Sequence, residues 1–262
     1  MYQDHFKMTR QPFCEHAAAE SLWIDQRMKE ATARLTYLVE QATLGLITGP
    51  SGAGKSALLK HFFHHLPQRC EAVYCHLTHL PAAGVLKVIV SQLGEVPRRG
   101  KDRLFEQIFQ AASRTEGTLL LALDEAHLLD GEALTDLRLL VSSAVETAPP
   151  LKILLAGQPA LRTVLRRSQH LDLLHRINVH YQLRALSKQQ TAHYIDVQMK
   201  QAGAPEDVFD GSVKDLIHDF TGGIPRQINN LATACLIQAA AAGVLRIDEA
   251  LLAQTTAEFQ LA

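Results

Sequence analysis

Short apolar runs alternate with amphipathic segments along the chain up to about residue 186. Runs of about four to eight residues are typical of buried strands and too short for most helices. They fall at residues 44–48, 71–77, 118–123, 151–156 and 177–183. Between the runs, apolar residues recur at helical spacing, as Met28, Leu35 and Leu38 do within residues 26–42. Strands joined by crossover helices predict a right-handed α/β fold with a five-stranded parallel sheet.

The pattern becomes helical throughout from about residue 187. Ser187 is a plausible N-cap for a helix that reaches about Gln201. Further helices are predicted at residues 212–220, 225–242 and 248–259. We therefore predict three parts, which are an N-terminal extension (1–24), an α/β core (25–186) and a small all-helical lid (187–262). The extension is irregular, and we expect buried anchors such as Phe6 to tie it to the core.

Composition narrows the class of protein. Apolar residues make up 47% of the chain and the formal net charge is −1, so any nucleic-acid surface would have to be local. The 4 cysteines are too scattered for a disulfide framework, which indicates a reducing compartment. The N-terminus lacks the features of a signal peptide, and the longest apolar run, residues 239–245, is too short to span a bilayer. We predict a cytoplasmic protein without a membrane partner.

A phosphate-binding motif lies between the first strand and the helix that follows it. Residues 49–56 read G-x-x-x-x-G-K-S, the pattern of a P-loop. Glycines let the backbone approach phosphate closely, and backbone N–H groups at a helix N-terminus favour negative charge. We predict that Lys55 reaches the β- and γ-phosphates of ATP and that Ser56 is a ligand of Mg²⁺. The residues assigned to ATP in this loop are Gly49, Pro50, Ser51, Gly52, Ala53, Gly54, Lys55 and Ser56.

Two carboxylates follow the third apolar run, in the arrangement called Walker B. Asp124 would hold Mg²⁺ directly or through water, and Glu125 would orient and polarise the attacking water. Two exposed acids at a strand end are the alternative interpretation, which a P-loop earlier in the same chain disfavours. After the fourth run, Gln158 is either a sensor beside the γ-phosphate and the water or simply the start of a helix.

A basic loop is the local candidate for a nucleic-acid surface. It carries Arg98, Arg99, Lys101 and Arg103, which could grip a phosphate backbone. A solvated surface loop has the same composition, so both interpretations stay open.

Six motifs in order carry a family resemblance over nearly the whole chain. They are His5-Phe6 with Pro12-Phe13, the P-loop, Asp124-Glu125-Ala126-His127, Leu155-Ala156-Gly157-Gln158-Pro159, Arg176-Ile177 and Gly222-Gly223-Ile224-Pro225-Arg226. The chain resembles AAA+ ATPases of the ExeA/GspA-like group. This group overlaps the transposition ATPases of the TniB, TnsC and MuB type.

The resemblance implies roles for two arginines outside the loop. Arg226 would be the sensor-2 arginine, which places the lid over the γ-phosphate. Arg176 would be an arginine finger that reaches a neighbouring subunit's nucleotide, which implies a homo-oligomeric ring or helical filament. Arg166 or Arg167 could serve instead, and all three could be plain surface arginines.

The resemblance leaves two processes in competition. Secretion-type members usually continue into a membrane helix and a peptidoglycan-binding domain, and neither is found here. We therefore expect an ATPase that, when loaded with ATP, oligomerises on DNA, selects target sites and recruits or activates a transposase. The alternative is a cytosolic ATPase of type II secretion or type IV pilus assembly that acts on protein partners. A switch that barely hydrolyses ATP is disfavoured because Glu125 is present.

Overall fold

The computed structural model describes residues 2–15, 17–142 and 151–259, which divide by their contacts into two compact units. The α/β unit contains residues 24–51 and 55–183. The helical unit contains the described residues up to Trp23, the short segment Gly52–Gly54 and those from Arg184 onward. Each unit is described by itself below. Within the described ranges, no helix combines the length and apolarity needed to cross a bilayer.

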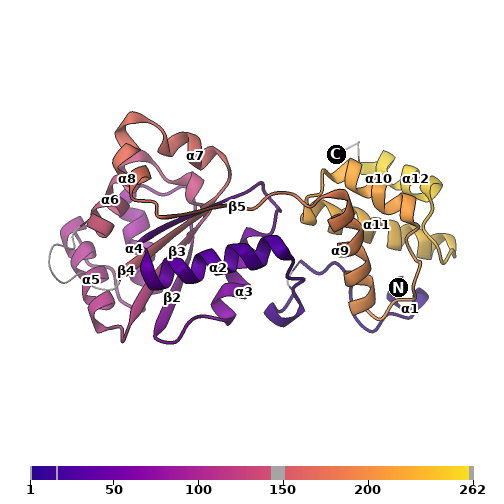
Figure 1. Cartoon of the computed structure of the whole chain (residues 1–262), viewed down its shortest axis with the longest axis horizontal. Coiled ribbons are helices and arrows are strands. Elements are labelled where there is room, and N and C mark those ends of the chain that lie inside the picture. The colour runs from indigo at the N-terminus through magenta and orange to yellow at the C-terminus, as the bar shows by residue number, and fades with distance from the viewer. Residues whose placement is uncertain (1, 16, 143–150, 260–262) are drawn as a thin grey trace. The chain divides into compact units, whose positions relative to one another are not determined.

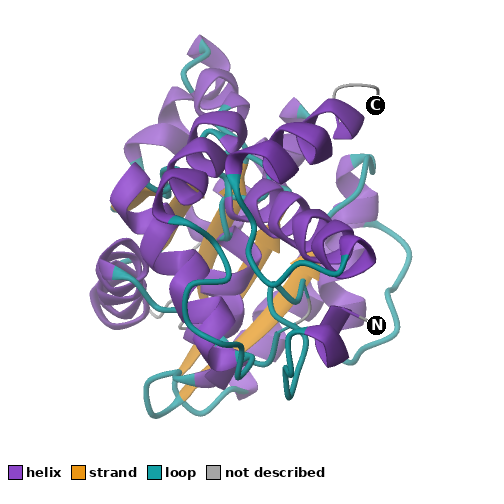
Figure 2. Cartoon of the chain, turned by 90° about the vertical axis from the view of Figure 1, so that its right-hand side faces the viewer, coloured by secondary structure: helices purple, strands orange, loops and turns teal. Residues whose placement is uncertain are grey.

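The α/β unit is built on a sheet of five parallel strands, as predicted (Figures 1 and 2). In chain order they are β1 (Leu44–Thr48), β2 (Cys70–His76), β3 (Thr118–Asp124), β4 (Leu151–Gly157) and β5 (Val179–Gln182). Their order in the sheet is β2-β3-β4-β1-β5, so β1 lies between β4 and β5. The last strand is shorter than the predicted residues 177–183.

Helices cover both faces of this sheet (Figure 1). They are α2 (Gln26–Gln41), α3 (Lys55–His64), α4 (Ala82–Gln92), α5 (Lys101–Arg114), α6 (Gly131–Ser142), α7 (Ala160–Leu165) and α8 (Leu171–His175), with short 3₁₀ turns η2 (Ala126–Leu128) and η3 (Ser168–His170). Because crossovers are right-handed, α2 and α3 share one face, and α4, α5 and α6 share the other. The sequence pattern also predicts a helix over residues 132–146, which α6 matches up to Ser142; residues 143–146 lie outside the described residues.

Burial on both faces explains why the strands read as continuous apolar runs. Along β3, Leu119, Leu121 and Leu123 join the cluster formed with α4 and α6. Leu120 and Ala122, on the opposite face, are also fully buried. The polar residues Asp124 and Glu125 therefore come where the apolar run ends, at the carboxyl edge of the sheet.

The helical unit contains four main helices in addition to the N-terminal segment. They are α9 (Lys188–Gln201), α10 (Gly211–Thr221), α11 (Pro225–Ala242) and α12 (Glu249–Phe259), and the N-terminal segment adds α1 (Tyr2–His5) and the 3₁₀ turn η1 (Ala19–Ser21). Ser187 is the N-cap of α9, as expected, and forms a capping box with Gln190. Among the described residues of the helical unit, the only β-type pairing is an isolated bridge between Phe209 and Ile247.

The N-terminal segment packs within the helical unit. Phe6 and Phe13 are buried there, and the Phe13 ring meets Phe209 edge to face at 6.3 Å. The backbone N–H of Thr9 donates to the carbonyl of Ala202 at 2.8 Å. Phe6 and Phe13 are thus buried as expected, but the prediction that they tie the segment to the α/β core is wrong, because the residues that bury them belong to the C-terminal helices.

Candidate active site

The loop that follows β1 is held in a conformation that only small residues allow. The Gly49 N–H donates to the Gly157 carbonyl at 3.2 Å, which ties the loop to the end of β4. A Cβ atom at Gly49 would lie 2.6 Å from the Leu183 carbonyl oxygen. Gly52 and Gly54 have φ values of 77° and 103°, in the region that L-residues rarely adopt. The glycines thus keep the loop open as a cradle lined by backbone atoms, and larger residues at these positions would clash or strain the backbone.

Lys55 opens α3 and is buried at the base of this cradle. Its side-chain Nζ donates to the carbonyl oxygens of Gly49 and Pro50, at 2.9 and 3.0 Å. The residue is 5% exposed, so its charge lies out of bulk water and close to the loop backbone. A buried ammonium with carbonyl partners can exchange them for phosphate oxygens, which carry more negative charge.

Ser56 and Asp124 bring two oxygen groups together next to the loop. The Ser56 hydroxyl donates to Asp124 Oδ2 at 2.9 Å, and Asp124 is 1% exposed. Hydroxyl and carboxylate oxygens are ligands that Mg²⁺ accepts, and this ion usually keeps waters and substrate phosphates as its other ligands. No group of three or more His, Cys, Asp or Glu in the described part of the chain could hold a metal by itself. The pair fits Mg²⁺ brought in with a nucleotide.

Glu125 directly follows β3, at the carboxyl edge of the sheet. Its backbone is left-handed, with φ 58° and ψ 30°, a conformation that is costly for a residue with a side chain and that also occurs here at Lys7, Phe13, Arg69 and Asp207. Its backbone N–H donates to Asp124 Oδ1 at 2.8 Å, which links the two acids. Its Oε2 lies 3.3 Å from Nδ1 of His127, a residue to which the sequence assigned no separate role.

Tyr74 is the second site residue that sequence reasoning missed. It lies on β2, and its hydroxyl donates to Asp124 Oδ2 at 2.8 Å. Burial, followed by the hydrogen bond to Asp124, raises the pKa of the Tyr74 hydroxyl above its ordinary value. A tyrosine hydroxyl is protonated at physiological pH even without this shift, so it can donate to the Asp124 carboxylate.

Gln158 and Arg176 stand where the sequence predicted, at the ends of β4 and α8. The Gln158 carbonyl accepts from the Leu161 N–H at 3.0 Å, which begins the turn into α7. Both side chains lack hydrogen bonds and ion pairs to any residue that the structure describes. The geometry therefore leaves the sensor role of Gln158 and the finger role of Arg176 as predictions.

Arg226 begins α11 and contacts the glycine segment that groups with the helical unit. Its backbone N–H donates to the Gly52 carbonyl at 3.2 Å, and a Cβ at Gly52 would lie 2.7 Å from Arg226 Cβ. The guanidinium is largely exposed, with Nε 3.6 Å from Glu15 Oε1. The sensor role of Arg226 likewise stays a prediction.

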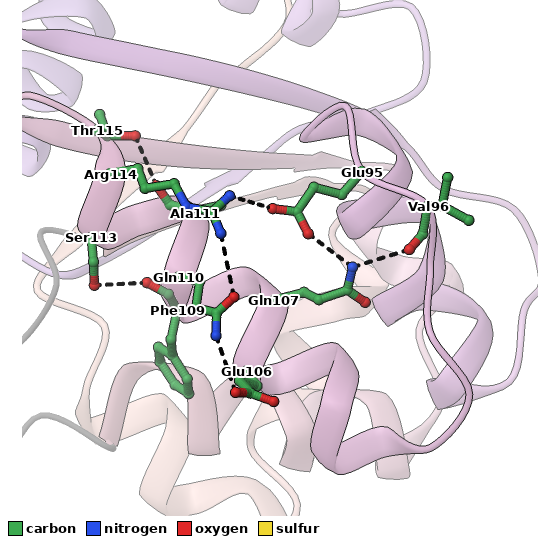
Figure 3. A network of polar contacts seen from close by, with 10 residues as sticks. All are labelled: Glu95, Val96, Glu106, Gln107, Phe109, Gln110, Ala111, Ser113, Arg114 and Thr115. Carbon is green, nitrogen blue, oxygen red and sulfur yellow. Dashed lines mark hydrogen bonds and ion pairs between the residues drawn. The ribbon is translucent and has the colours of Figure 1, made fainter.

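The basic loop before α5 is anchored from beneath by Gln107 (Figure 3). Gln107 is 2% exposed; its amide donates to Glu95 and to the Val96 carbonyl, and its oxygen accepts from the Arg98 N–H. Arg114 completes the network through an ion pair with Glu95 at 2.9 Å.

The four basic residues of this region do not share one environment. Arg98, Arg99 and Arg103 are exposed. Lys101 instead places its Nζ 2.6 Å from a Glu132 oxygen and 2.7 Å from Asp136 Oδ2, so its charge is already offset. The loop is a defined structure that presents three arginines rather than four cations.

Three comparisons relate the chain to known proteins. A family model described as an AAA domain matches residues 38–165. General secretion pathway protein A of Aeromonas hydrophila is 32% identical over 257 residues, which cover 94% of this chain and 46% of that protein. The chain therefore spans about half the length of this curated relative.

Solved structures extend the likeness in fold. The Drosophila ORC bound to DNA aligns with a TM-score of 0.75 at 16% identity, over 98% of this chain and 65% of that one. Cdc6p from Pyrobaculum aerophilum aligns with a TM-score of 0.72 at 15% identity, over 94% and 70%. A RuvB mutant from Thermotoga maritima aligns with a TM-score of 0.59 at 16% identity, over 88% and 69%. At such identities the likeness shows the fold alone.

Proposed function

The chain belongs to the ExeA/GspA-like AAA+ ATPases, and we propose that it binds ATP with Mg²⁺ at residues 49–56 and hydrolyses it. One observation carries the proposal. The Ser56 hydroxyl and the buried Asp124 carboxylate lie 2.9 Å apart beside the P-loop, with Glu125 next along the chain. Such a pair of oxygen groups suits a nucleotide-bound Mg²⁺ better than it suits a merely structural contact.

Each residue has a distinct part in the proposed reaction. The backbone N–H groups of the loop and Lys55 bind and orient the phosphates. Ser56 and Asp124 would hold Mg²⁺, which supplies positive charge against the β- and γ-phosphate oxygens. Glu125 orients a water oxygen toward the γ-phosphorus and accepts its proton as the bond to the β–γ bridging oxygen breaks.

Nucleotide binding and turnover test the proposal directly. Calorimetry would measure the affinity for ATP and for a non-hydrolysable analogue, and phosphate release would measure turnover, each with Mg²⁺ and with EDTA. The proposal requires nucleotide binding that Mg²⁺ strengthens, together with turnover that EDTA abolishes. Absence of binding under both conditions would overturn it.

We further propose that hydrolysis takes place between copies of this chain, with Arg176 supplied by the neighbour. Its exposed guanidinium is available for such a contact. Replacing Arg176 by alanine should then lower turnover about 10³-fold or more, with ATP affinity nearly unchanged. The Arg166→Ala and Arg167→Ala variants serve as comparisons, because either residue could take this role.

Mixing experiments distinguish a finger acting between subunits from one acting within a subunit. An Arg176→Ala protein retains Glu125, and a Glu125→Gln protein retains Arg176. If the finger acts between subunits, mixing the two inactive proteins restores part of the activity. Failure to restore it at concentrations where the chain self-associates would contradict the assignment.

For the process served, we propose action on protein partners of a secretion or pilus assembly system. The support is the curated relative, whose name places it in a general secretion pathway and whose similarity covers 94% of this chain. The neighbours that bind DNA are matched at fold level only.

DNA-dependent assembly for transposition is the second candidate, favoured by the exposed Arg98, Arg99 and Arg103. Duplex DNA titrated with the analogue-loaded protein, from about 50 to 200 mM salt, separates the candidates, because phosphate contacts weaken steeply with salt. ATP-dependent, salt-sensitive rings or filaments on DNA, seen by electron microscopy and lost when the three arginines become alanine, favour this second candidate. An absence of DNA binding at low salt with ATP turnover intact favours protein partners.

A further inference from the structure

We propose that Tyr74 is a positioning residue that holds the Asp124 carboxylate in the orientation needed to bind Mg²⁺. The inference rests on the proposed function, because it concerns the same nucleotide site. Tyr74 belongs to none of the motifs that identify the site, and it comes from β2, the edge strand next to β3. The evidence for this role is the set of hydrogen bonds that hold the Asp124 carboxylate.

Three donors fix the two oxygens of that carboxylate. The Tyr74 hydroxyl donates to Oδ2 at 2.8 Å, and the Ser56 hydroxyl donates to the same oxygen at 2.9 Å. The Glu125 backbone N–H donates to Oδ1 at 2.8 Å. Since Asp124 is 1% exposed, water contributes little to holding it, and the protein donors determine its orientation.

The three donors are not equivalent when a metal ion binds. Ser56 is itself a predicted Mg²⁺ ligand, and the Glu125 N–H belongs to a segment whose carboxylate must serve the water. The Tyr74 hydroxyl is neither a predicted Mg²⁺ ligand nor part of the segment that positions the water. It can therefore hold Asp124 in one orientation before and after the metal arrives, which lowers the cost of organising the site.

The Tyr74 ring is itself positioned by the helix that carries Ser56. In the parallel pairing of β2 with β3, Tyr74 stands opposite Ala122, two residues before Asp124, so its side chain must reach along the strand to the carboxylate. Phe63 on α3 meets the ring at 6.2 Å between centroids, with the planes inclined by 70°. One contact chain thus joins α3, β2 and β3 around the proposed metal position.

The Tyr74→Phe variant tests this role, because it removes the hydroxyl and leaves the ring. Tyr37→Phe is the matched control, since Tyr37 is 54% exposed and lies on α2. The readout is the affinity for a fluorescent, non-hydrolysable ATP analogue as free Mg²⁺ is varied, with a parallel measurement in EDTA. Thermal unfolding monitored by circular dichroism confirms that both variants fold.

The expected result is a Mg²⁺ requirement about three- to tenfold higher for Tyr74→Phe, the effect of one lost hydrogen bond of ordinary net strength, since Asp124 keeps its two other donors. Nucleotide affinity in EDTA should stay within about twofold of the parent chain, and Tyr37→Phe should match the parent throughout. A Mg²⁺ curve that overlays the parent's would overturn the inference. So would an equal loss of affinity with and without Mg²⁺, which indicates a purely structural tyrosine.

The failure of the proposed function looks different. If the parent chain binds the analogue equally well with Mg²⁺ and with EDTA, the Mg²⁺ site itself is wrong, and the role of Tyr74 falls with it. A Mg²⁺-dependent parent with an unaffected Tyr74→Phe variant rejects the tyrosine alone. Replacing Phe63 by leucine removes the ring contact with Tyr74, together with one to Phe62, and leaves the Tyr74 hydroxyl in place; it should move the Mg²⁺ requirement in the same direction by a smaller factor.

Discussion

Replacing Glu125 by glutamine is expected to lower ATP turnover about 10²- to 10⁴-fold while ATP remains bound. Glutamine keeps the size of the side chain, but it cannot accept a proton from water. The left-handed backbone at Glu125 and the N–H that it donates to Asp124 involve the main chain, so the substitution leaves them in place. The side chain is 30% exposed, and because glutamine has nearly the same shape, its packing is retained.

Single-turnover phosphate release and equilibrium ATP binding would be measured together. The matched control is Glu116→Gln, an exposed glutamate of the turn before β3, for which both quantities should equal those of the parent chain. Turnover within about twofold of the parent for Glu125→Gln would remove this residue from the reaction. A parallel loss of ATP affinity would instead indicate a role in binding.

Replacing Lys55 by alanine should weaken ATP affinity about 10- to 100-fold and abolish measurable turnover. Lys55 is 5% exposed, and its Nζ lies within 3.0 Å of the carbonyl oxygens of Gly49 and Pro50, at the position where phosphates are expected. A charge-assisted hydrogen bond to phosphate contributes more than a neutral one, and each factor of ten in affinity corresponds to about 1.4 kcal/mol.

Lys60→Ala is the control for this variant, because Lys60 lies on the same helix and is exposed. Calorimetric titration with ATP compares the two proteins, and circular dichroism checks that α3 is intact. The binding assignment would not survive if Lys55→Ala bound ATP with the affinity of the parent chain. Removal of Nζ also frees two loop carbonyls, so a small change in stability without nucleotide is expected.

The fold was largely predictable because both periodicities are strong in this sequence. Buried parallel strands leave continuous apolar runs, and the five predicted strands match the observed ones closely apart from the short β5. The helices beyond Ser187 also follow the prediction. The packing of Phe6 and Phe13 within the C-terminal helices was not predictable in detail, since it joins residues about two hundred positions apart and leaves no local pattern.

The site was predictable to the extent that its chemistry lies in contiguous motifs. The P-loop and the pair Asp124-Glu125 are short runs with fixed spacing, and the structure brings Ser56 to Asp124. Tyr74 could not be found in this way, because its contact depends on how β2 pairs with β3. The single signal in the sequence was a tyrosine on the predicted strand that follows the P-loop helix along the chain. The ion pairs of Lys101 with Glu132 and Asp136 were hidden for the same reason, since they join residues far apart in the sequence.

The process served was the least predictable part. The expectation from the sequence is transposition, whereas the curated relative is a secretion pathway protein. Both processes use the same ATP chemistry, so the motifs cannot separate them. Partner surfaces such as the Arg98 loop carry that information, and their composition alone is ambiguous.

Both ends of the chain contribute to the helical unit, which constrains how the protein can be synthesised. Phe6 and Phe13 leave the ribosome long before α11 exists, and at roughly 5 to 20 residues per second the delay is about ten to forty seconds. The α/β unit is nearly contiguous in the chain and can fold during that interval. The segment that carries Phe6 and Phe13 therefore stays without its packing partners until α11 has been synthesised.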